Sequence, residues 1–422
     1  MKTLNLITEG RAARASARLL AALPTETKNR ALCAMAEAVR AQAPDVLAAN
    51  ALDVQDAVHE GRTAAFIDRL LLTPERVEHM ASGIEQVAAL PDPVGAVIDA
   101  WERPNGLLIR QVRVPIGVIG FIYESRGTVT CDAVALCFKS GNAVILRGGS
   151  EARRTNRVLA GLLRGVLLEL SLPEDAIQLL SGGDHAEVAA LCSLEGWVDV
   201  VIPRGGKNLI RAVMDAARVP VLKHLDGVCH LYIDAAADLD MALDLADDAK
   251  TQRPGVCNAV ETILVHADYA EAFLPRLAER MRERGVECRA CPRSLPFFGV
   301  AGIPATEEDW RTEYEDLIVS VKVADSAREA VEHINEYGSH HSDAIVTEDA
   351  AARDLFLRDV DSACVYWNAS TRFSDGEEFG FGAEIGIGTD KLHARGPMAL
   401  RELTSYKYEI LGNGQVKDAA RL

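Results

Sequence analysis

Short apolar segments, each followed by a pair of glycines, recur three times between residues 143 and 206. The segments are residues 143–146, 176–180 and 198–202, and the pairs that follow them are Gly148-Gly149, Gly182-Gly183 and Gly205-Gly206. Short apolar strands separated by helices are typical of a parallel sheet. Ligands bind such a sheet at the carboxyl ends of its strands, where the N-termini of helices attract phosphate. The pattern therefore predicts an α/β fold with a ligand site at that edge.

The glycine pairs permit two interpretations. Each pair taken alone is also common as the turn that starts a helix. Three pairs in the same register, with Arg147 and Lys207 beside two of them, favour an anionic dinucleotide. No G-x-G-x-x-G follows the first strand and no G-x-x-x-x-G-K-[ST] is present, so the pattern suggests a nucleotide site without identifying the nucleotide.

Length and composition indicate a globular protein of two or three domains. The 422 residues are too many for one ordinary core, and 49% of them are hydrophobic. The formal net charge of −17 opposes non-specific binding to nucleic acids and adsorption to anionic membranes. An anionic substrate is still compatible with this charge, because it needs only a locally basic pocket.

Several features favour a cytoplasmic protein. The N-terminal residues lack the apolar core of a signal peptide, and no apolar stretch approaches the ~20 residues of a membrane span. The nine cysteines are an odd number without disulfide-like spacing, which favours a reducing compartment. Cys288 and Cys291 form a lone C-x-x-C with no second pair at zinc-finger spacing, so we expect no metal site.

Changes of pattern along the chain predict its domains. Residues 1 to about 90 read as helices. Two apolar runs then flank Asn105-Gly106, which is a hairpin signal, and this hairpin is either internal or pairs with another subunit. A second α/β region follows, and residues 404–410 alternate as a strand does. We expect domains at 1–226 (with the hairpin at about 94–114), at 227–395 and at 396–422.

One cysteine lies at a position suited to chemistry. Cys257 follows the Pro254-Gly255 turn and precedes the apolar run 262–265, so it falls on a turn that leads into a strand. Most cysteines are small buried side chains, which is the alternative interpretation of Cys257. We favour a nucleophile, since a thiolate is accessible near neutral pH and leaves well from a thioester. A nucleotide-type sheet joined to such a cysteine suggests aldehyde or acyl chemistry.

Six stretches resemble the aldehyde dehydrogenase superfamily, and specifically the branch of it that reduces γ-glutamyl phosphate. They are residues 114–126, 136–149, 201–206, 223–230, 253–258 and 368–397. The resemblance extends from about residue 30 to 410, and matches of this length are far more specific than a lone glycine motif. It implies an aldehyde-dehydrogenase-like α/β fold with a Rossmann-type cofactor domain, an α/β catalytic domain and a small β oligomerisation element.

The activity that the resemblance implies is NADPH-dependent reduction of L-glutamyl 5-phosphate to L-glutamate 5-semialdehyde and phosphate. The reaction would pass through a cysteine thioester and belong to proline biosynthesis. The alternatives are an acyl-CoA reductase or an oxidising aldehyde dehydrogenase of the same superfamily, or a non-catalytic binding protein that retains the fold. A homodimer or homotetramer is implied, and an association with the upstream kinase that makes the acyl phosphate is left open.

The resemblance also implies roles for individual residues. Cys257 is the nucleophile. Arg147, Ser150 and Glu151 belong to the turn that binds the adenosine ribose, and a cation there favours NADPH over NADH. The other implied cofactor contacts are Tyr123, Glu124, Ser125, Gly205, Gly206 and Glu313. A solvated surface acid is the alternative interpretation of Glu313.

Arg126 is implied as the group that binds the acyl phosphate or the oxyanion, since a guanidinium suits both. Gly127-Thr128 follows it where the family usually has Pro-Asn. The implied substrate contacts are Arg126, His224, Asn368, Ser370 and Thr371, with a structural histidine and a polar loop as alternatives. His224 stands approximately where oxidising members carry the glutamate that activates water, and loss of that base suits a reductase.

Overall fold

The computed structural model describes residues 6–124, 127–180, 185–223 and 225–417. The chain forms two compact units. Unit 1 comprises residues 1–223, 381–386 and 398–422, and unit 2 comprises residues 224–380 and 387–397. The first boundary lies three residues before the predicted position at 226. The segment predicted as a separate module, 396–422, falls almost entirely within unit 1, because its strand pairs with a strand of that unit.

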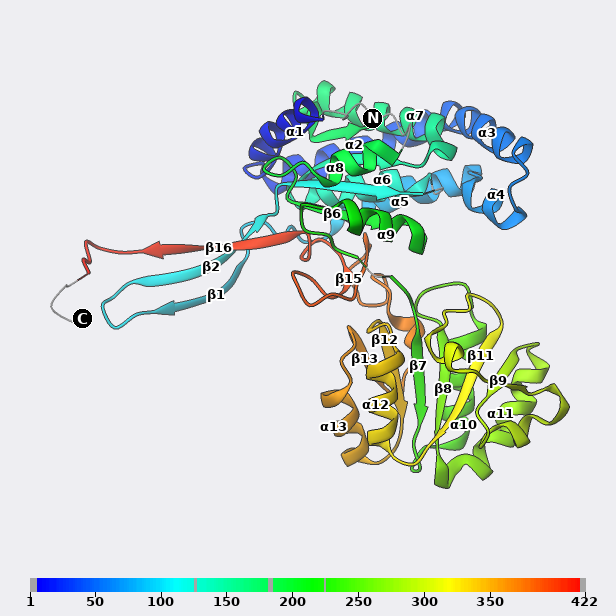
Figure 1. Ribbon diagram of the computed structural model, residues 1–422. Coiled ribbons are helices and arrows are strands. Elements are labelled where there is room, and N and C mark those ends of the chain that lie inside the picture. The colour runs from blue at the N-terminus through cyan, green and yellow to red at the C-terminus, as the bar shows by residue number, and fades with distance from the viewer. Residues whose placement is uncertain (1–5, 125–126, 181–184, 224, 418–422) are drawn as a thin grey trace. The chain divides into compact units, whose positions relative to one another are not determined.

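Helices fill the first ninety residues of unit 1, as the apolar periodicity predicts (Figure 1). They are α1 (Ile7–Leu20), α2 (Thr25–Ala41), α3 (Ala43–His59), α4 (Ala64–Leu70) and α5 (Pro74–Ala89). The start of α5 is capped, since the Thr73 side chain accepts a hydrogen bond from the Arg76 N–H and Pro74 takes the first helical position. These helices form a layer that carries buried apolar side chains.

A four-stranded parallel sheet is the centre of unit 1, in the order β5-β4-β3-β6. Its strands are β3 (Val118–Tyr123), β4 (Ala143–Gly148), β5 (Ile177–Leu179) and β6 (Val200–Arg204). The helices that alternate with them are α6 (Thr128–Lys139), α7 (Arg153–Glu169), α8 (His185–Cys192) and α9 (Lys207–Ala216), with short 3-10 turns η1 (Ser150–Ala152) and η2 (Glu174–Ala176). The parallel pairing of these strands confirms the prediction of a parallel sheet, and every residue of β3 and β4 is buried.

An antiparallel sheet of three strands also belongs to unit 1. The strands β1 (Val97–Glu102) and β2 (Leu108–Pro115) form the predicted hairpin, with Gly106 at φ +83° in its turn. The strand β16 (Thr404–Leu411) pairs with the other edge of β2. We call this three-stranded sheet the arm. Most residues of β1 and β16 are exposed, in contrast to the buried strands of the parallel sheet.

Unit 2 is built on a seven-stranded parallel sheet in the order β10-β9-β11-β8-β7-β12-β13. Its strands are β7 (Cys229–Ile233), β8 (Val260–His266), β9 (Glu287–Ala290), β10 (Ile303–Pro304), β11 (Ile318–Ala324), β12 (Ser342–Val346) and β13 (Cys364–Trp367). Its helices are α10 (Leu239–Thr251), α11 (Ala270–Glu283), α12 (Ala327–Tyr337) and α13 (Ala350–Asp359). Strand β8 contains the apolar run 262–265 noted in the sequence.

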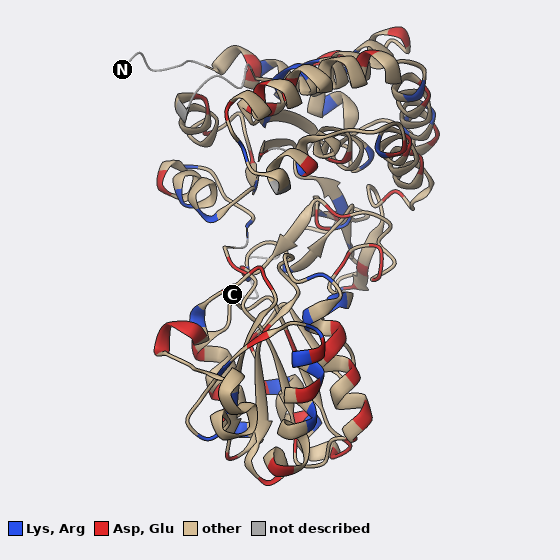
Figure 2. Cartoon of the chain, turned by 90° about the vertical axis from the view of Figure 1, so that its right-hand side faces the viewer, with Lys and Arg blue, Asp and Glu red and all other residues tan. Residues whose placement is uncertain are grey.

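The remaining elements are short. Strands β14 (Gly386–Gly388) and β15 (Gly396–Met398) pair with each other, and the 3-10 turns are η3 (Ala267–Tyr269), η4 (Leu295–Ala301), η5 (Glu307–Arg311) and η6 (Thr371–Phe373). Acidic residues occur on many helices of both units (Figure 2). Across the described part of the chain, no helix is both long and apolar enough to cross a membrane.

Candidate active site

Cys257 lies on the loop of unit 2 that joins α10 to β8, as the Pro254-Gly255 turn predicts. All nine cysteines are free thiols. Seven of them are buried, Cys33 is exposed, and Cys257 is partly exposed. A buried packing cysteine is therefore a poor description of Cys257, because its side chain reaches solvent from a loop at the amino end of a central strand.

A buried ion pair joins the two ends of this loop. Lys250, in the last turn of α10, donates to Glu261 Oε2 at 2.6 Å, and Glu261 is the second residue of β8. Both side chains are fully buried. Burial raises the pKa of Glu261 to about 7 although Lys250 opposes the shift, and burial lowers the pKa of Lys250. The pair therefore bridges the two ends of the segment 251–260. Its buried environment disfavours either charge without the other.

Gly227 lies against the backbone of Cys257. A Cβ at position 227 would overlap the carbonyl oxygen and the Cα of Cys257, so only glycine allows this approach. The Gly227 N–H donates to Glu313 Oε1 at 2.9 Å. Glu313 is therefore placed beside the cysteine loop by a specific bond, and a solvated surface acid does not describe it.

Two neighbours fix the cysteine backbone from other directions. The Cys229 thiol donates to the Cys257 carbonyl oxygen at 3.1 Å, and burial raises the pKa of Cys229 well above its usual value, which keeps this donor protonated. Asn258 donates through Nδ2 to Ser374 O at 3.0 Å, and its own carbonyl oxygen accepts from Thr371 Oγ1 at 2.7 Å. The carbonyl group of Cys257 and the residue that follows it are thus held in place.

Two arginines place positive charge near the loop that carries Cys257. Arg372 donates through Nε to Gln252 Oε1 at 2.9 Å. Burial lowers the pKa of Arg372; Asp248 and Cys257 oppose that shift, and Arg253 adds to it. Arg253 is exposed on the cysteine loop itself. Cys257 thus lies within electrostatic reach of a guanidinium, a group that attracts anions to this loop.

A hydrogen-bonded acid anchors the segment that carries Glu313. Asp309 accepts from Arg289 at 2.7 Å, from the Thr306 N–H at 2.6 Å and from the Tyr314 hydroxyl at 2.9 Å. Burial alone would raise the pKa of Asp309, but these bonds outweigh it and lower the pKa from 3.8 to about 2. Tyr314 follows Glu313 directly, so Asp309 holds the position of that acid.

The turns Gly148-Gly149 and Gly205-Gly206 lie in unit 1, at the carboxyl ends of β4 and β6, and Gly182-Gly183 lies outside the described residues. Gly206, which precedes α9, donates its N–H to Glu124 Oε2 at 2.9 Å. A Cβ at Gly205 would lie 2.6 Å from the same carboxylate oxygen. A side chain at position 205 would displace this carboxylate from its present place. Glu124, predicted to line the nicotinamide cleft, has its carboxylate at the N-terminus of α9.

The other predicted cofactor residues lie in different settings. Ser150 is exposed, Glu151 is partly buried, and a Cβ at Gly149 would overlap the Glu151 carboxylate. Arg147 is in β4 and only 9% exposed. Tyr123 is 1% exposed and shares a 2.6 Å hydrogen bond with Thr130, so its side chain is in the core and not in a cleft. Atoms accessible to a cofactor are therefore found on the turn that follows β4, at Ser150, and not on Arg147 in β4 or Tyr123 in β3.

The three predicted substrate contacts that the structure describes are engaged within the chain. Asn368 bonds to the backbone of Thr347 through both side-chain atoms, and Ser370 caps η6. Thr371 is fully buried and supports Asn258. Their contribution to substrate binding stays a prediction. Ser125, Arg126 and His224 lie outside the described residues, so their assignments stay predictions as well.

Sequence patterns did not reveal several residues that shape the site. The sequence patterns assign no role to Lys250, Glu261 or Asp309. They include Arg253 only as part of the stretch 253–258. One signal was available for Glu261, because a charged residue inside an apolar strand requires a buried partner. The partner and its position relative to the cysteine loop depend on the fold.

Comparison with known proteins agrees with this geometry. A model of the aldehyde dehydrogenase family matches residues 8–289. A gamma-glutamyl phosphate reductase from Moorella thermoacetica is 53% identical over 414 residues, which cover 98% of this chain and 99% of the relative. The crystal structure of gamma-glutamyl phosphate reductase from Thermotoga maritima matches with a TM-score of 0.96 and 44% identity, covering 98% of this chain and 100% of that one.

A third match is the gamma-glutamyl phosphate reductase of Saccharomyces cerevisiae, with a TM-score of 0.53, 31% identity and coverage of 97% of this chain and 98% of that one. The chain belongs to the aldehyde dehydrogenase family, whose members use a nicotinamide cofactor. Within that family it belongs to the gamma-glutamyl phosphate reductases.

Replacing Gly227 with alanine is expected to lower activity about 100-fold with little loss of fold, because the new Cβ displaces the Cys257 backbone. Gly255→Ala is the matched control, since a Cβ there meets only Glu315 O at an ordinary 3.4 Å. The rate of Cys257 alkylation, measured in a Cys33→Ser background, should fall with activity in Gly227→Ala. Equal alkylation rates in the two variants would contradict the proposed displacement.

Replacing Asp309 with asparagine is expected to lower the free energy of unfolding by about 2–3 kcal/mol at pH 6. The folded-state pKa lies below the unfolded value, so this stability is present above about pH 4 and is lost as the pH falls toward 2. Urea unfolding from pH 6 to 2 should therefore show the wild type and the variant converging. Asp240→Asn, with a side chain 86% exposed, is the control and should leave the profile unchanged. A constant difference across the range would contradict the assignment.

Proposed function

We propose that this protein catalyses the NADPH-dependent reduction of L-glutamyl 5-phosphate to L-glutamate 5-semialdehyde and phosphate, with Cys257 as the nucleophile. The observation that carries the proposal is the partly exposed Cys257 thiol on a loop tied by Lys250 and Glu261. Full-length similarity to gamma-glutamyl phosphate reductases supports the choice of substrate. The reaction belongs to proline biosynthesis.

The first chemical step forms a thioester. The Cys257 thiolate attacks the acyl carbon, the bond from that carbon to the phosphate oxygen breaks, and phosphate leaves with the electron pair. Arg253 and Arg372 attract the two anionic ends of the substrate, its phosphate and its α-carboxylate. Arg126 binds the acyl phosphate or the oxyanion, and Asn368, Ser370 and Thr371 shape the loop that faces the substrate.

The residues of unit 1 fit a dinucleotide. The Gly206 N–H already donates to a carboxylate oxygen of Glu124, which is the kind of bond that a phosphate oxygen accepts. Arg147, Ser150, Glu151, Gly205 and Gly206 would hold the nucleotide, and Glu313 would hold the nicotinamide ribose. Bound NADPH supplies the hydride that turns the thioester into the aldehyde.

Reduction is favoured over oxidation because the chain lacks a water-activating glutamate at the expected place. Residues 223–227 read Lys-His-Leu-Asp-Gly, with His224 at the approximate position of that base. A water activated beside the thioester would release the free acid and waste the substrate. We assign His224 to contact with the phosphate group. The nine free cysteines suit a reducing cytoplasm, where we place the protein.

The decisive assay is phosphate-dependent reduction of NADP by glutamate 5-semialdehyde, the reverse reaction, followed by the absorbance of NADPH. We expect activity in the wild type and a loss of at least ~1000-fold in Cys257→Ala. Cys33→Ser, which removes the exposed thiol, should be unaffected. An acyl-CoA reductase would depend on coenzyme A, an oxidising dehydrogenase would need no phosphate, and a binding protein would be inactive. Full activity of Cys257→Ala would refute the mechanism.

The arm supports self-association into a homodimer or homotetramer. Tyr406, Tyr408 and Ile410 on β16 are 51%, 53% and 62% exposed, and Val97 on β1 is 50% exposed. Large apolar side chains on the edge strands of a sheet mark a surface that pairs with another chain. The occupant that this family membership favours is a second copy of the arm.

Introducing charge into the arm is expected to dissociate the oligomer. Tyr408→Glu combined with Ile410→Glu should sediment as a monomer in analytical ultracentrifugation, because unpaired charge is costly in an apolar interface. Leu168→Glu is the matched control, since Leu168 is an apolar residue with 62% exposure that lies on α7, outside the arm. A wild-type monomer would refute the proposed interface.

A further inference from the structure

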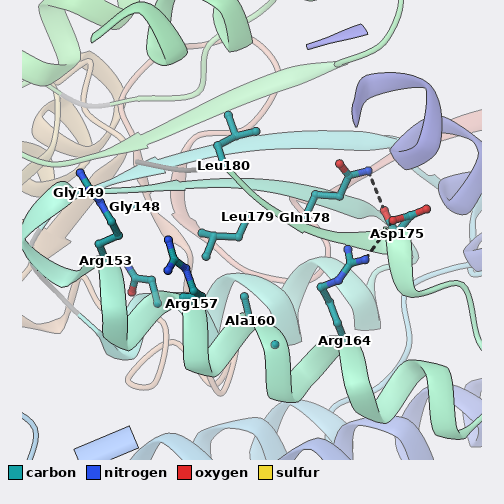
Figure 3. Close-up of a pocket in the computed structure, with 12 residues that line it drawn as sticks. Gly148, Gly149, Arg153, Arg157, Ala160, Arg164, Asp175, Gln178, Leu179 and Leu180 are labelled. Carbon is teal, nitrogen blue, oxygen red and sulfur yellow. Dashed lines mark hydrogen bonds and ion pairs between the residues drawn. The ribbon is translucent and has the colours of Figure 1, made fainter. Parts of the chain in front are cut away.

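The amino-acid end of the proposed substrate has to be recognised close to Cys257. Only two methylene groups separate the acyl carbon that Cys257 attacks from the α-carbon, which carries an ammonium and a carboxylate group. The groove of unit 1, which Gly148, Gly149 and the α7 residues Arg153 and Arg157 line (Figure 3), adjoins the turn assigned to the adenosine ribose. That groove belongs to the proposed dinucleotide site, so recognition of the α-carbon groups depends on side chains around the cysteine loop.

The loop that follows β13 uses most of its polar side chains internally. Asn368 and Thr371 donate to backbone carbonyl oxygens. The Ser370 hydroxyl accepts from the Arg372 N–H at 3.3 Å. These bonds hold the loop in shape and occupy the uncharged side chains. Two charged side chains of the loop, Arg372 and Asp375, have atoms that the bonds do not use.

Arg372 is tied to the cysteine loop at two points. Asn258, the residue after Cys257, donates through Nδ2 to Arg372 O at 3.3 Å and to Ser374 O at 3.0 Å. The Arg372 side chain donates through Nε to Gln252 Oε1 at 2.9 Å, near the start of the same loop. The backbone and the guanidinium of Arg372 are therefore both held against the loop that carries the nucleophile.

The terminal nitrogens of Arg372 suit a carboxylate. Within the described part of the chain, no hydrogen bond or ion pair involves its Nη1 or Nη2, and the residue is partly exposed. Because a guanidinium is planar and rigid, the bond from Nε also sets the direction of the two Nη groups. A guanidinium held in this way presents the fork that a carboxylate accepts through two parallel hydrogen bonds.

An acid lies on the same loop. Asp375 follows Ser374 directly and is partly exposed. Its Oδ1 accepts from the Glu377 N–H at 2.8 Å, whereas its Oδ2 has no hydrogen bond to any residue that the structure describes. Asp375 also lies within electrostatic reach of Arg372. A guanidinium and a carboxylate on one loop match the opposite charges of an α-carboxylate and an α-ammonium group.

We propose that Arg372 binds the α-carboxylate of the substrate and that Asp375 binds its α-ammonium group, so that this loop selects an α-amino acid. The inference rests on the proposed function and specifies how its substrate is recognised. The phosphate end is assigned to Arg126 and His224, which leaves the α-carboxylate for Arg372. Arg253 is the alternative partner, but it is exposed, and among the described residues it has no hydrogen bond that would fix its guanidinium.

Aldehydes that lack one charged group test the assignment in the reverse reaction. Compared with glutamate 5-semialdehyde, 4-aminobutanal lacks the α-carboxylate and 5-oxopentanoate lacks the α-amino group. The measured quantity is kcat/KM for phosphate-dependent reduction of NADP by each aldehyde. In the wild type each analogue should be used at least ~30-fold less efficiently, because it leaves a charged side chain of the site unpaired.

The variants should remove these preferences one at a time. In Arg372→Gln, kcat/KM should fall ~30-fold for the two aldehydes that carry a carboxylate and less than ~3-fold for 4-aminobutanal. Asp375→Asn should show the complementary pattern, with 5-oxopentanoate unaffected. Arg372→Lys should recover part of the loss, because it keeps the charge without the fork. Arg311→Gln is the matched control, since Arg311 bonds to Glu336 O in another part of unit 2, and it should keep the wild-type preferences.

A loss of equal size on all three aldehydes in Arg372→Gln would overturn the inference, because it would indicate a purely structural role. Equal use of the three aldehydes by the wild type would also overturn it, and so would a preference that survives in Arg372→Gln and Arg372→Lys but is lost in Arg253→Gln. Absence of phosphate-dependent activity in the wild type would overturn the proposed function as well. Activity without any preference would leave that function standing.

Discussion

The buried pair of Lys250 and Glu261 is the constraint on which the cysteine site depends. Removing two charges from water costs several kcal/mol per ion, and their attraction seldom returns more than that. A buried pair thus adds little to stability, but it fixes the distance between its two charged groups. Here Lys250 Nζ lies 2.6 Å from Glu261 Oε2. Because one partner ends α10 and the other begins β8, the pair fixes the span of the loop that carries Cys257. Gly227, Cys229 and Asn258 then hold the backbone within that span.

A local excess of positive charge recurs in a chain with a formal net charge of −17. Arg253 and Arg372 act near Cys257, and Arg153 and Arg157 line the groove of unit 1. Charges farther apart than the ~8 Å screening length of physiological salt contribute little, so the overall acidity does not repel an anion once it reaches these side chains. The overall acidity therefore limits non-specific binding of anions, whereas the binding of a particular anion depends on a few arginine side chains.

Sequence patterns predicted the elements with a strong period and missed those without one. The apolar runs of β8 and β12 and the Asn-Gly hairpin are visible directly, whereas β9 reads Glu-Cys-Arg-Ala and carries no apolar signal. Cys257 was found because Pro-Gly and an apolar strand bracket it. The inward direction of Tyr123 and the bond from Gly206 to Glu124 were not readable, since a wholly buried strand shows no alternation and the bond joins residues 82 positions apart.

The pairing of β16 with β2 has a consequence for synthesis of the chain. The arm joins residues 108–115 to residues 404–411, so nearly 300 residues separate the two strands, as the 299-residue interval between Arg110 and Glu409 illustrates. A ribosome completes the whole parallel sheet of unit 2 before it releases the strand that finishes unit 1. Until then β2 presents an open edge, and such edges invite pairing with other chains. Correct completion of the arm thus depends on β16 pairing with β2 before a strand of another chain does.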